Sequence, residues 1–154
     1  MKTSLARGFT LIELVVVITI LGILAAFAVP RFISLETQAR SATINSLAGS
    51  VKSAASLARG MAMATATAPS GTVQMEGNPV TLSNYYPDTG ATGIAFALST
   101  ISSSDFTFTP GSPVTTGAAK WTKIGAATPA NCSVTYTPAA ANAAPVVAID
   151  TSAC

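Results

Sequence analysis

The sequence predicts an α+β fold in which a long N-terminal helix packs on an antiparallel β-sheet. Three observations lead to this prediction. A long segment that begins near Thr10 is first apolar on all sides and then amphipathic at helical spacing. The part of the chain after this segment holds short stretches that alternate between apolar and polar side chains, as strands do. Two cysteines, Cys132 and Cys154, lie near the C-terminus.

The first half of the predicted helix is apolar on all sides. Leu11–Val29 contains nineteen residues, and Glu13 is the only ionisable one. At about 1.5 Å per residue this segment is roughly 28 Å long, which matches the hydrocarbon core of a bilayer. We therefore expect residues 9–30 to form a transmembrane half-helix. An ionisable side chain in such a segment is costly and marks a site with a specific partner, so Glu13 is the candidate functional residue.

A short basic leader precedes the apolar half. Lys2 and Arg7 would stay on the cytoplasmic side of a membrane under the positive-inside rule. Secretory signals are cut after their apolar region, whereas the glycine of this leader, Gly8, comes before it. A cut after Gly8 would keep the apolar segment and create a free amine on Phe9, a natural partner for the Glu13 carboxylate. The alternative is that Glu13 lies at headgroup depth, where the dipole of a helix N-terminus favours negative charge.

The second half of the helix is amphipathic and extends over residues 31–62. The side chains of its predicted buried stripe recur at helical spacing: Ile33, Thr37, Ile44, Leu47, Val51, Ala55, Ala58 and Ala62. Gly22 and Pro30 interrupt the helix before this stripe. Because proline lacks an N–H donor and clashes with the preceding turn, we expect a kink near residues 26–30. The stripe needs a partner surface, which residues 63–154 must supply.

The globular part is predicted to contain mostly short antiparallel strands. These strands are Thr72–Glu76, Val80–Ser83, Phe106–Phe108, Lys120–Ile124, Cys132–Thr137 and Val146–Ile149. Between the second and third of them, Asn84–Gly93 is a predicted loop, and Ile94–Ile101 is compatible with a short helix.

The composition argues against several classes of function. Charged residues make up 9% of the chain and hydrophobic residues 49%. Without the leader, six basic side chains balance six acidic ones, so the clustered basic surface of a nucleic-acid-binding protein is not expected. The chain has no histidine, which excludes Ser-His-Asp, Cys-His and histidine-containing metal sites. We predict that the chain is not an enzyme and holds no cofactor or metal.

The two cysteines predict one disulfide, formed outside the cytoplasm. A bond between Cys132 and Cys154 would fix the C-terminus, and a loop of this size stabilises a fold by roughly 3 kcal/mol in chain-entropy models. The alternative, a pair of metal ligands, lacks further ligands in the sequence.

The octapeptide Arg7-Gly8-Phe9-Thr10-Leu11-Ile12-Glu13-Leu14 resembles the class III signal of type IV prepilins. The resemblance implies that prepilin peptidase cleaves between Gly8 and Phe9 and that Phe9 is then N-methylated. It implies that Glu13 pairs with the N-terminal amine of a neighbouring subunit, so that this residue aligns and registers a subunit entering a filament.

The resemblance extends to the rest of the chain. It implies that the helix is locally unwound between Gly22 and Pro30 in the filament, and that Cys132 and Cys154 close a C-terminal disulfide-bounded region. Several segments are also similar to pilins of the mannose-sensitive haemagglutinin (MSHA) type. These segments are Arg31-Phe32, residues 57–60, residues 80–87, residues 93–98 and residues 132–137. The chain departs from that group at Tyr85, because it has Tyr85-Tyr86-Pro87 where these pilins tend to have Gly-Tyr-Pro.

Together these features predict a type IV pilin fold and a role as the structural subunit of a type IVa surface filament. Its parts would be a leader (residues 1–8), an apolar half-helix (9–30), an amphipathic half-helix (31–62) and a globular head (63–154).

The resemblance implies adhesion, with surface motility and DNA uptake as further family functions. The implied partners are further copies of the chain, prepilin peptidase and the assembly machinery of the inner membrane. The prepilin would be a single-pass protein of the bacterial inner membrane, and the mature chain part of an extracellular pilus. The alternatives are a pseudopilin of type II secretion, a minor pilin and a monomeric membrane-anchored binding domain.

Overall fold

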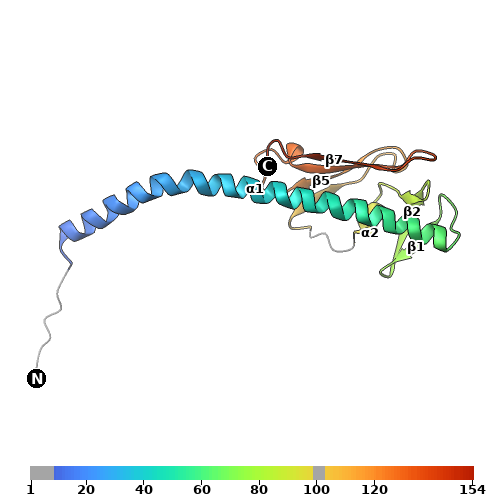
Figure 1. Cartoon of the computed structure of the whole chain (residues 1–154), viewed down its shortest axis with the longest axis horizontal. Coiled ribbons are helices and arrows are strands. Elements are labelled where there is room, and N and C mark those ends of the chain that lie inside the picture. The colour runs from blue at the N-terminus through green and yellow to red at the C-terminus, as the bar shows by residue number, and fades with distance from the viewer. Residues whose placement is uncertain (1–8, 99–102) are drawn as a thin grey trace, which may run out of the picture. The chain divides into compact units, whose positions relative to one another are not determined.

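The computed structural model describes residues 9–98 and 103–154. Its main helix, α1, spans Leu11–Ala64, and two antiparallel sheets follow it in the chain (Figure 1). The predicted α+β fold, with a long N-terminal helix and antiparallel strands, is therefore confirmed. The chain divides into two compact units, one that ends at Thr37 and one that spans Gln38–Cys154, and α1 contributes to both. We refer to them as the N-terminal unit and the C-terminal unit.

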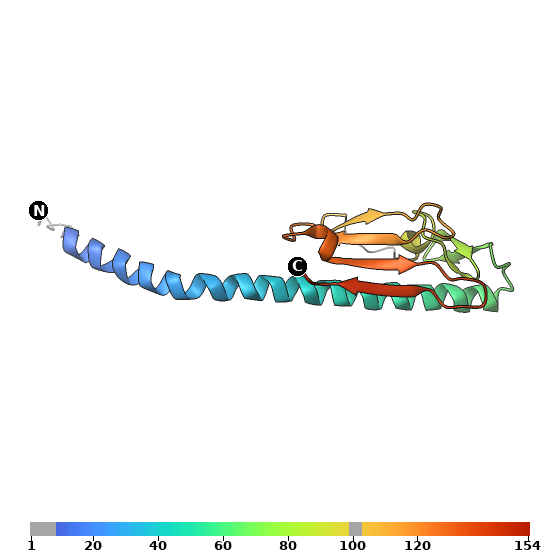
Figure 2. The same ribbon diagram turned by 90° about the horizontal axis from the view of Figure 1, so that it is seen from above.

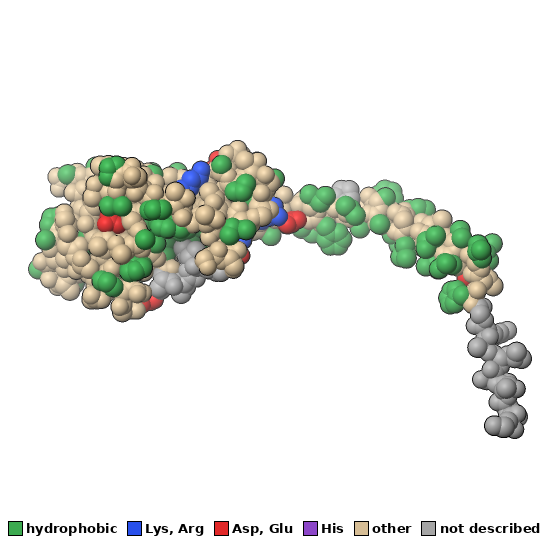
Figure 3. All heavy atoms as spheres, turned by 180° about the vertical axis from the view of Figure 1, so that it is seen from behind, with side chains coloured by type: hydrophobic (Ala, Val, Ile, Leu, Met, Phe, Trp, Pro, Cys, Tyr) green, Lys and Arg blue, Asp and Glu red, His purple; other side chains and the backbone are tan. Residues whose placement is uncertain are grey.

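The N-terminal unit is described over residues 9–37, and its large apolar side chains are exposed. Their exposed fractions run from 42% at Val15 to 84% at Phe9. Figure 3 shows such side chains along this part of the helix with few charges between them. By length and composition alone, α1 contains a segment able to cross a membrane. The helix has no break at Gly22 or Pro30, so the unwinding implied for a filament stays a prediction.

In the C-terminal unit, α1 buries one face beneath the two sheets. The predicted stripe is buried from Ile44 onward, with Ile44, Val51, Ala58 and Ala62 fully inaccessible. Ala48 and Ala54 are buried as well, although the predicted stripe did not include them. Such small side chains let neighbouring elements approach the helix backbone closely. Two predicted members, Ile33 and Thr37, belong to the N-terminal unit and are exposed.

The helix ends two residues beyond its predicted limit, in a backbone cap rather than at a glycine. Ala66 adopts a left-handed conformation with φ 50°. The Thr67 N–H bonds to the Ala62 carbonyl at 2.9 Å, and the Ala66 N–H bonds to the Met63 carbonyl at 3.4 Å. This pair of bonds is the Schellman motif, which satisfies carbonyls that the helix leaves without partners.

The first sheet has three strands in the order β1-β2-β3. They are β1 (Thr72–Met75), β2 (Asn78–Ser83) and the two-residue β3 (Tyr86–Pro87). Their inward side chains form a small core with the last turns of α1: Ala58, Ala62, Val73, Met75, Val80 and Leu82. The sequence predicted β1 and most of β2 but assigned β3 to a loop. β3 exists because its residues pair with Leu82 and Ser83, and because the Tyr136 hydroxyl donates to the Pro87 carbonyl at 2.8 Å.

The turn between β2 and β3 has an unusual composition. Its central residues, Asn84 and Tyr85, have φ angles of 53° and 69°. Two consecutive positive φ angles are typical of a type I′ turn, whose twist matches that of the flanking strands. Asparagine tolerates this region, but tyrosine does so at a cost, since its Cβ crowds the following carbonyl. The position that departs from the MSHA-type pattern is therefore one where the backbone favours glycine.

The second sheet has four strands in the order β4-β5-β6-β7 (Figure 2). They are β4 (Phe106–Thr109), β5 (Ala119–Lys123), β6 (Ser133–Thr137) and β7 (Val146–Asp150). The register pairs Phe108 with Trp121, Trp121 with Val134, and Val134 with Ile149. The sequence predicted all four strands to within about a residue, but it did not predict that the strands divide into two sheets.

A short helix and a disulfide complete the larger core. Helix α2 (Ile94–Ala97) follows β3, and a 3₁₀ turn (Pro129–Asn131) precedes β6. The core contains Ile44, Leu47, Val51, Ile94, Trp121, Val134 and Tyr136. Cys132 and Cys154 are both buried in this core and form the predicted disulfide, with Cα atoms 4.7 Å apart. The Arg40 guanidinium donates to the Cys154 carbonyl at 2.9 Å, which further holds the C-terminal residues against α1.

We expect removal of the disulfide to weaken the C-terminal unit. The double variant Cys132→Ala/Cys154→Ala should lose roughly 3 kcal/mol of unfolding free energy, because the unfolded chain regains the entropy of a loop of this size. Trp121 is the only tryptophan and is 2% exposed. Its fluorescence therefore reports denaturant unfolding of the full chain in detergent. The oxidised protein with added reductant is the control and should match the variant. Equal midpoints for the variant and the oxidised protein would contradict this account.

We also expect the turn at Tyr85 to limit stability. Tyr85→Gly should raise the unfolding free energy by about 1 kcal/mol, because glycine adopts positive φ without steric cost. Tyr85→Ala is the matched control, since it removes the same ring but keeps the Cβ atom. The gain is attributable to the backbone only if the glycine variant exceeds the alanine variant in Trp121-monitored unfolding. Two variants of equal stability would show that Tyr85 is not strained.

Candidate functional site

The first turn of α1 holds Glu13, the carboxylate that the sequence singles out. One carboxylate oxygen accepts hydrogen bonds from the Thr10 backbone N–H at 2.9 Å and from the Thr10 hydroxyl at 2.8 Å. In return, the Thr10 hydroxyl oxygen accepts a bond from the Glu13 N–H at 3.3 Å. This reciprocal arrangement is a capping box, in which two side chains satisfy N–H groups that the helix start leaves without partners.

The sequence carries the signal for this cap, although it was not used in the prediction. A threonine followed three residues later by a glutamate, directly before an apolar run, is the sequence pattern of a capping box. The finding gives Glu13 a local role at the helix N-terminus, in agreement with the alternative that places its charge near the helix dipole. This local role does not compete with pairing to an amine, because a carboxylate accepts several hydrogen bonds.

Phe9 lies beside Glu13 at the start of the N-terminal unit. The two residues border one shallow groove together with Ile12, Val16 and Val17. Gly8, the other residue of the predicted cleavage site, lies outside the described residues. Cleavage at that bond would convert the Phe9 nitrogen into an amine one residue before the Thr10 N–H that already donates to Glu13. The geometry therefore puts the carboxylate within local reach of the new chain end.

Apolar side chains surround this polar turn and continue along the helix. The exposed ones include Leu11, Leu14, Ile18, Leu21, Leu24, Phe27, Phe32 and Leu35. Burying one such side chain is worth about 1.5–3 kcal/mol. Their number indicates that water is not the solvent of this segment in its functional state.

The three aspartates of the C-terminal unit each have partners within that unit. Asp105 forms an ion pair with Lys123 at 3.0 Å. Buried Asp88 accepts bonds from the Thr81 hydroxyl and the Gly90 N–H, both at 2.8 Å. Hydrogen bonds from the Ser152 hydroxyl and N–H lower the pKa of Asp150. Among the residues that the structure describes, no group of three His, Cys, Asp or Glu side chains could hold a metal ion.

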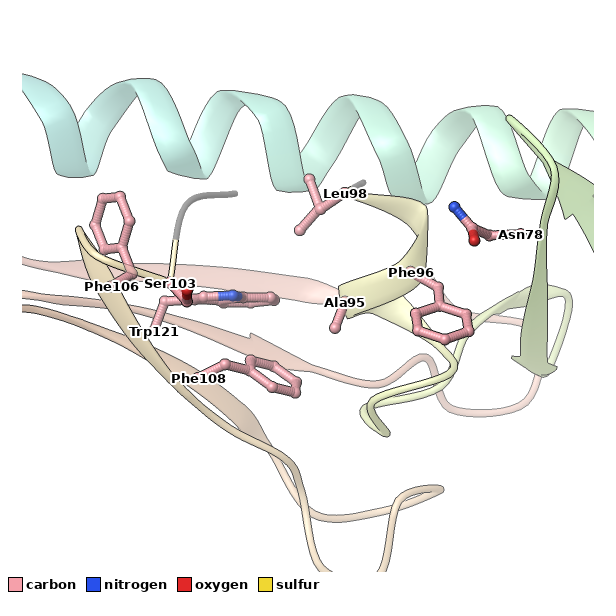
Figure 4. Close-up of a pocket in the computed structure, with 8 residues that line it drawn as sticks. All are labelled: Asn78, Ala95, Phe96, Leu98, Ser103, Phe106, Phe108 and Trp121. Carbon is pink, nitrogen blue, oxygen red and sulfur yellow. The ribbon is translucent and has the colours of Figure 1, made fainter. Parts of the chain in front are cut away.

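An aromatic cavity of about 360 Å³ lies between α2 and the four-stranded sheet (Figure 4). Phe106, Phe108 and Trp121 line it from the sheet, and Phe96 lines it from α2. The rings of Phe108 and Trp121 are 4.9 Å apart. None of the described residues that line this cavity is ionisable, so they supply no acid or base for catalysis.

Comparison with known proteins identifies the N-terminal segment. Residues 3–29 match the prokaryotic N-terminal methylation motif. The chain is 55% identical over 53 residues to the type IV narrow pilus major component PilA5 of Thermus thermophilus. It is 49% identical over 49 residues to the type IV major fimbrial protein FimA of Dichelobacter nodosus. It is 56% identical over 34 residues to the type IV major pilin protein PilA of Myxococcus xanthus.

These similarities are partial. They cover 34%, 32% and 22% of this chain, and 46%, 31% and 16% of the three relatives, so the chain matches less than half the length of each. No solved structure matches the chain at a significant level. The N-terminal segment is therefore similar to that of type IV pilins, and the long helix, antiparallel sheets and Cys132–Cys154 disulfide of the chain agree with the type IV pilin fold.

Proposed function

We propose that the chain is the structural subunit of a type IV pilus. One observation carries this proposal: a single carboxylate, Glu13, is held in the first turn of an exposed apolar helix, whereas the C-terminal unit has a core of its own. An enzyme or a receptor with a membrane anchor has no use for a carboxylate in the anchor. A filament subunit does, because the carboxylate can select its partner.

The proposed function begins with processing in the inner membrane. Prepilin peptidase removes residues 1–8 by cleaving between Gly8 and Phe9, and Phe9 is N-methylated. Residues 9–30 then anchor the subunit in the bilayer as a single-pass helix. This division of the chain, with an amphipathic half-helix over residues 31–62 and a head over residues 63–154, is part of the proposal. The methylation motif over residues 3–29 supports the processing step and the anchor.

Assembly then transfers the apolar helix from lipid to the core of a helical filament of identical subunits. An unpaired carboxylate in that core would cost several kcal/mol. The Phe9 amine of an adjacent subunit offsets this cost only when the two helices are in register, so Glu13 sets the register. Gly22 and Pro30 weaken the helix within the N-terminal unit, and we propose that the segment between them unwinds in the filament.

In this proposal the C-terminal units form the surface of an extracellular pilus. They would mediate adhesion, and the pilus would serve surface motility or DNA uptake, although nucleic acid is not a primary partner of the subunit. We assign the head to the MSHA type on the segments given above. The alternative within the same family is a type II secretion pseudopilin or a minor pilin. The proposal requires this chain to dominate the protein of sheared surface filaments, whereas a pseudopilin or a minor pilin would be absent from them or scarce.

We expect the mature subunit to begin at Phe9. Intact-mass analysis of filament protein should give the mass of residues 9–154 with one added methyl group and one disulfide. The apolar segment is retained because the peptidase cuts on its cytoplasmic side. A Gly8→Ala chain, carrying an added methyl group in place of the glycine hydrogen, tests the demand for glycine and should accumulate uncut. A mature chain that starts after residue 25 would contradict the proposal.

We expect Glu13 to be required for assembly because of its charge rather than its cap. Glutamine also completes a capping box, so Glu13→Gln keeps the helix start and removes the charge. Glu13→Val removes both. Each variant should reduce the yield of sheared filament by more than tenfold. A tenfold change corresponds to about 1.4 kcal/mol of the free energy that favours a subunit in the correct register. Membrane insertion and processing should continue in both.

Ile12→Val serves as the control for this experiment, since it changes a neighbouring exposed side chain without changing charge. Filament yield is compared with the amount of processed subunit in the membrane for all four chains. Normal assembly of Glu13→Gln together with failure of Glu13→Val would assign the residue a capping role only. Normal assembly of both would make the carboxylate dispensable.

A further inference from the structure

A second cavity lies within the C-terminal unit and shares no lining residue with the aromatic cavity. It has a volume of about 300 Å³ and is bordered by the end of α1, the β2–β3 turn and the segment before β7. Its polar and aromatic lining residues are Arg59, Asn84, Tyr85, Tyr86 and Asn142. The volume is at the lower end of the range for small-molecule sites.

Arg59 supplies this cavity with a cation in a fixed position. Its guanidinium lies over the Tyr86 ring, 4.9 Å from the centroid, and donates a hydrogen bond to the Tyr86 hydroxyl. Tyr86 is 7% exposed and is held in β3, so it provides a rigid support. No carboxylate of the described residues pairs with Arg59. Because a guanidinium has five N–H donors, most of them remain for a ligand, and the fixed side chain reduces the entropy lost on binding.

Tyr85 borders the same cavity in a conformation that the fold does not favour. Its φ of 69° is sterically unfavourable for a residue with a Cβ atom, yet the residue is only partly buried, with 37% exposed. Packing of the Tyr85 side chain within the chain therefore offsets little of this backbone strain. Residues held in strained conformations gather at binding sites, and two further lining residues are left-handed, Asn84 with φ 53° and Asn142 with φ 59°.

A neighbouring cavity extends the site along α1. It has a volume of about 260 Å³, shares Tyr86 with the first, and is lined by Lys52 and Pro145 among others. Lys52 precedes Arg59 by seven residues, two turns of helix, so the two residues lie on one face of α1 with their Cα atoms roughly 10 Å apart. The two adjoining cavities therefore each contain one basic residue and share one tyrosine.

We propose that this pair of cavities binds an acidic polysaccharide, with the carboxylate of one sugar on Arg59. Guanidinium groups bind carboxylates through two parallel hydrogen bonds. The Tyr85 ring suits the apolar C–H face of a sugar, and the Asn84 and Asn142 amides suit its hydroxyl groups. The Asn84 amide nitrogen already donates to the Ala139 carbonyl at 2.8 Å, so its second N–H and its carbonyl oxygen are left for a ligand. A small anion alone would leave the tyrosine and the amides without a role.

The test measures binding of trigalacturonic acid to the purified full chain in detergent by titration calorimetry. Galactotriose is the neutral control, and sodium acetate is the control for a free carboxylate. We expect saturable binding of trigalacturonic acid, no measurable binding of galactotriose, and no displacement by acetate at the same concentration. Because the subunit is tested without assembly, the result does not depend on whether the chain forms a pilus.

Variants locate the site. Arg59→Ala and Arg59→Lys should each weaken binding by at least tenfold, since lysine cannot form the two parallel bonds. Tyr85→Ala, which removes a partly exposed ring, should weaken binding without any change at Arg59. Lys120→Ala changes the net charge by the same amount as Arg59→Ala. It lies on β5, where its ammonium group bonds to the Ala130 carbonyl, and it should bind like the unaltered chain.

Trp121 fluorescence confirms that each variant is folded before binding is compared. The proposal is overturned by absence of saturable binding, by equal binding of galactotriose, or by unchanged affinity in both Arg59→Ala and Tyr85→Ala. Displacement by acetate at equal concentration would also overturn it, because the cavity would then be a site for small anions only.

Discussion

The C-terminal unit depends on the burial of one face of α1 beneath two separate sheets. An isolated helix of this composition would be marginal in water, and most helical stability in proteins comes from tertiary packing. The face that packs is rich in alanine: Ala48, Ala54 and Ala55 belong to the larger core, and Ala58 and Ala62 to the smaller one. A larger side chain at these positions would hold the sheets away from the helix. The disulfide and the Arg40 bond to Cys154 then keep the chain end over this contact.

The two units divide the apolar residues of α1 into those that this chain can bury and those that it cannot. From Ile44 to Ala62 the apolar face finds partners in the same chain, whereas from Leu11 to Leu35 the large apolar side chains remain exposed. Such a surface requires a bilayer or other subunits. In water, each large side chain would forgo the roughly 1.5–3 kcal/mol of free energy that its burial provides. Since the core of the C-terminal unit uses none of these residues, the N-terminal unit can exchange lipid for protein without disturbing it. That independence is what the proposed passage from membrane to filament needs.

Most of the fold could be read from the sequence, and the failures have physical causes. Periodicity located α1 to within two residues at its end, and alternation located β1 and β4–β7, because these signals come from burial on one face. β3 was missed because it has two residues and owes its position to partners distant in sequence, Leu82, Ser83 and the Tyr136 hydroxyl. The turn before it contains tyrosine where glycine is expected, so local turn chemistry gave no signal. In the candidate site, Glu13 stood out as a charge in an apolar run. The cap with Thr10 followed a known spacing, whereas the Arg59–Tyr86 contact joins distant segments and had no sequence signal.

The cap at Thr10 bears directly on how a carboxylate can be carried by an apolar helix. A charged group with no partner would hold the helix start at the membrane surface, since desolvation of an ion costs several kcal/mol. Two hydrogen bonds from Thr10 compensate part of this cost within the same chain. The free subunit therefore tolerates Glu13 without a partner, while one face of the carboxylate stays open to an amine. An amine that arrives in register adds a full charge of opposite sign, whose attraction grows as water is excluded. In the proposed filament, the Glu13 carboxylate is more stable when an amine joins the two neutral donors of Thr10 than when it has those donors alone. This difference in stability selects the correct register.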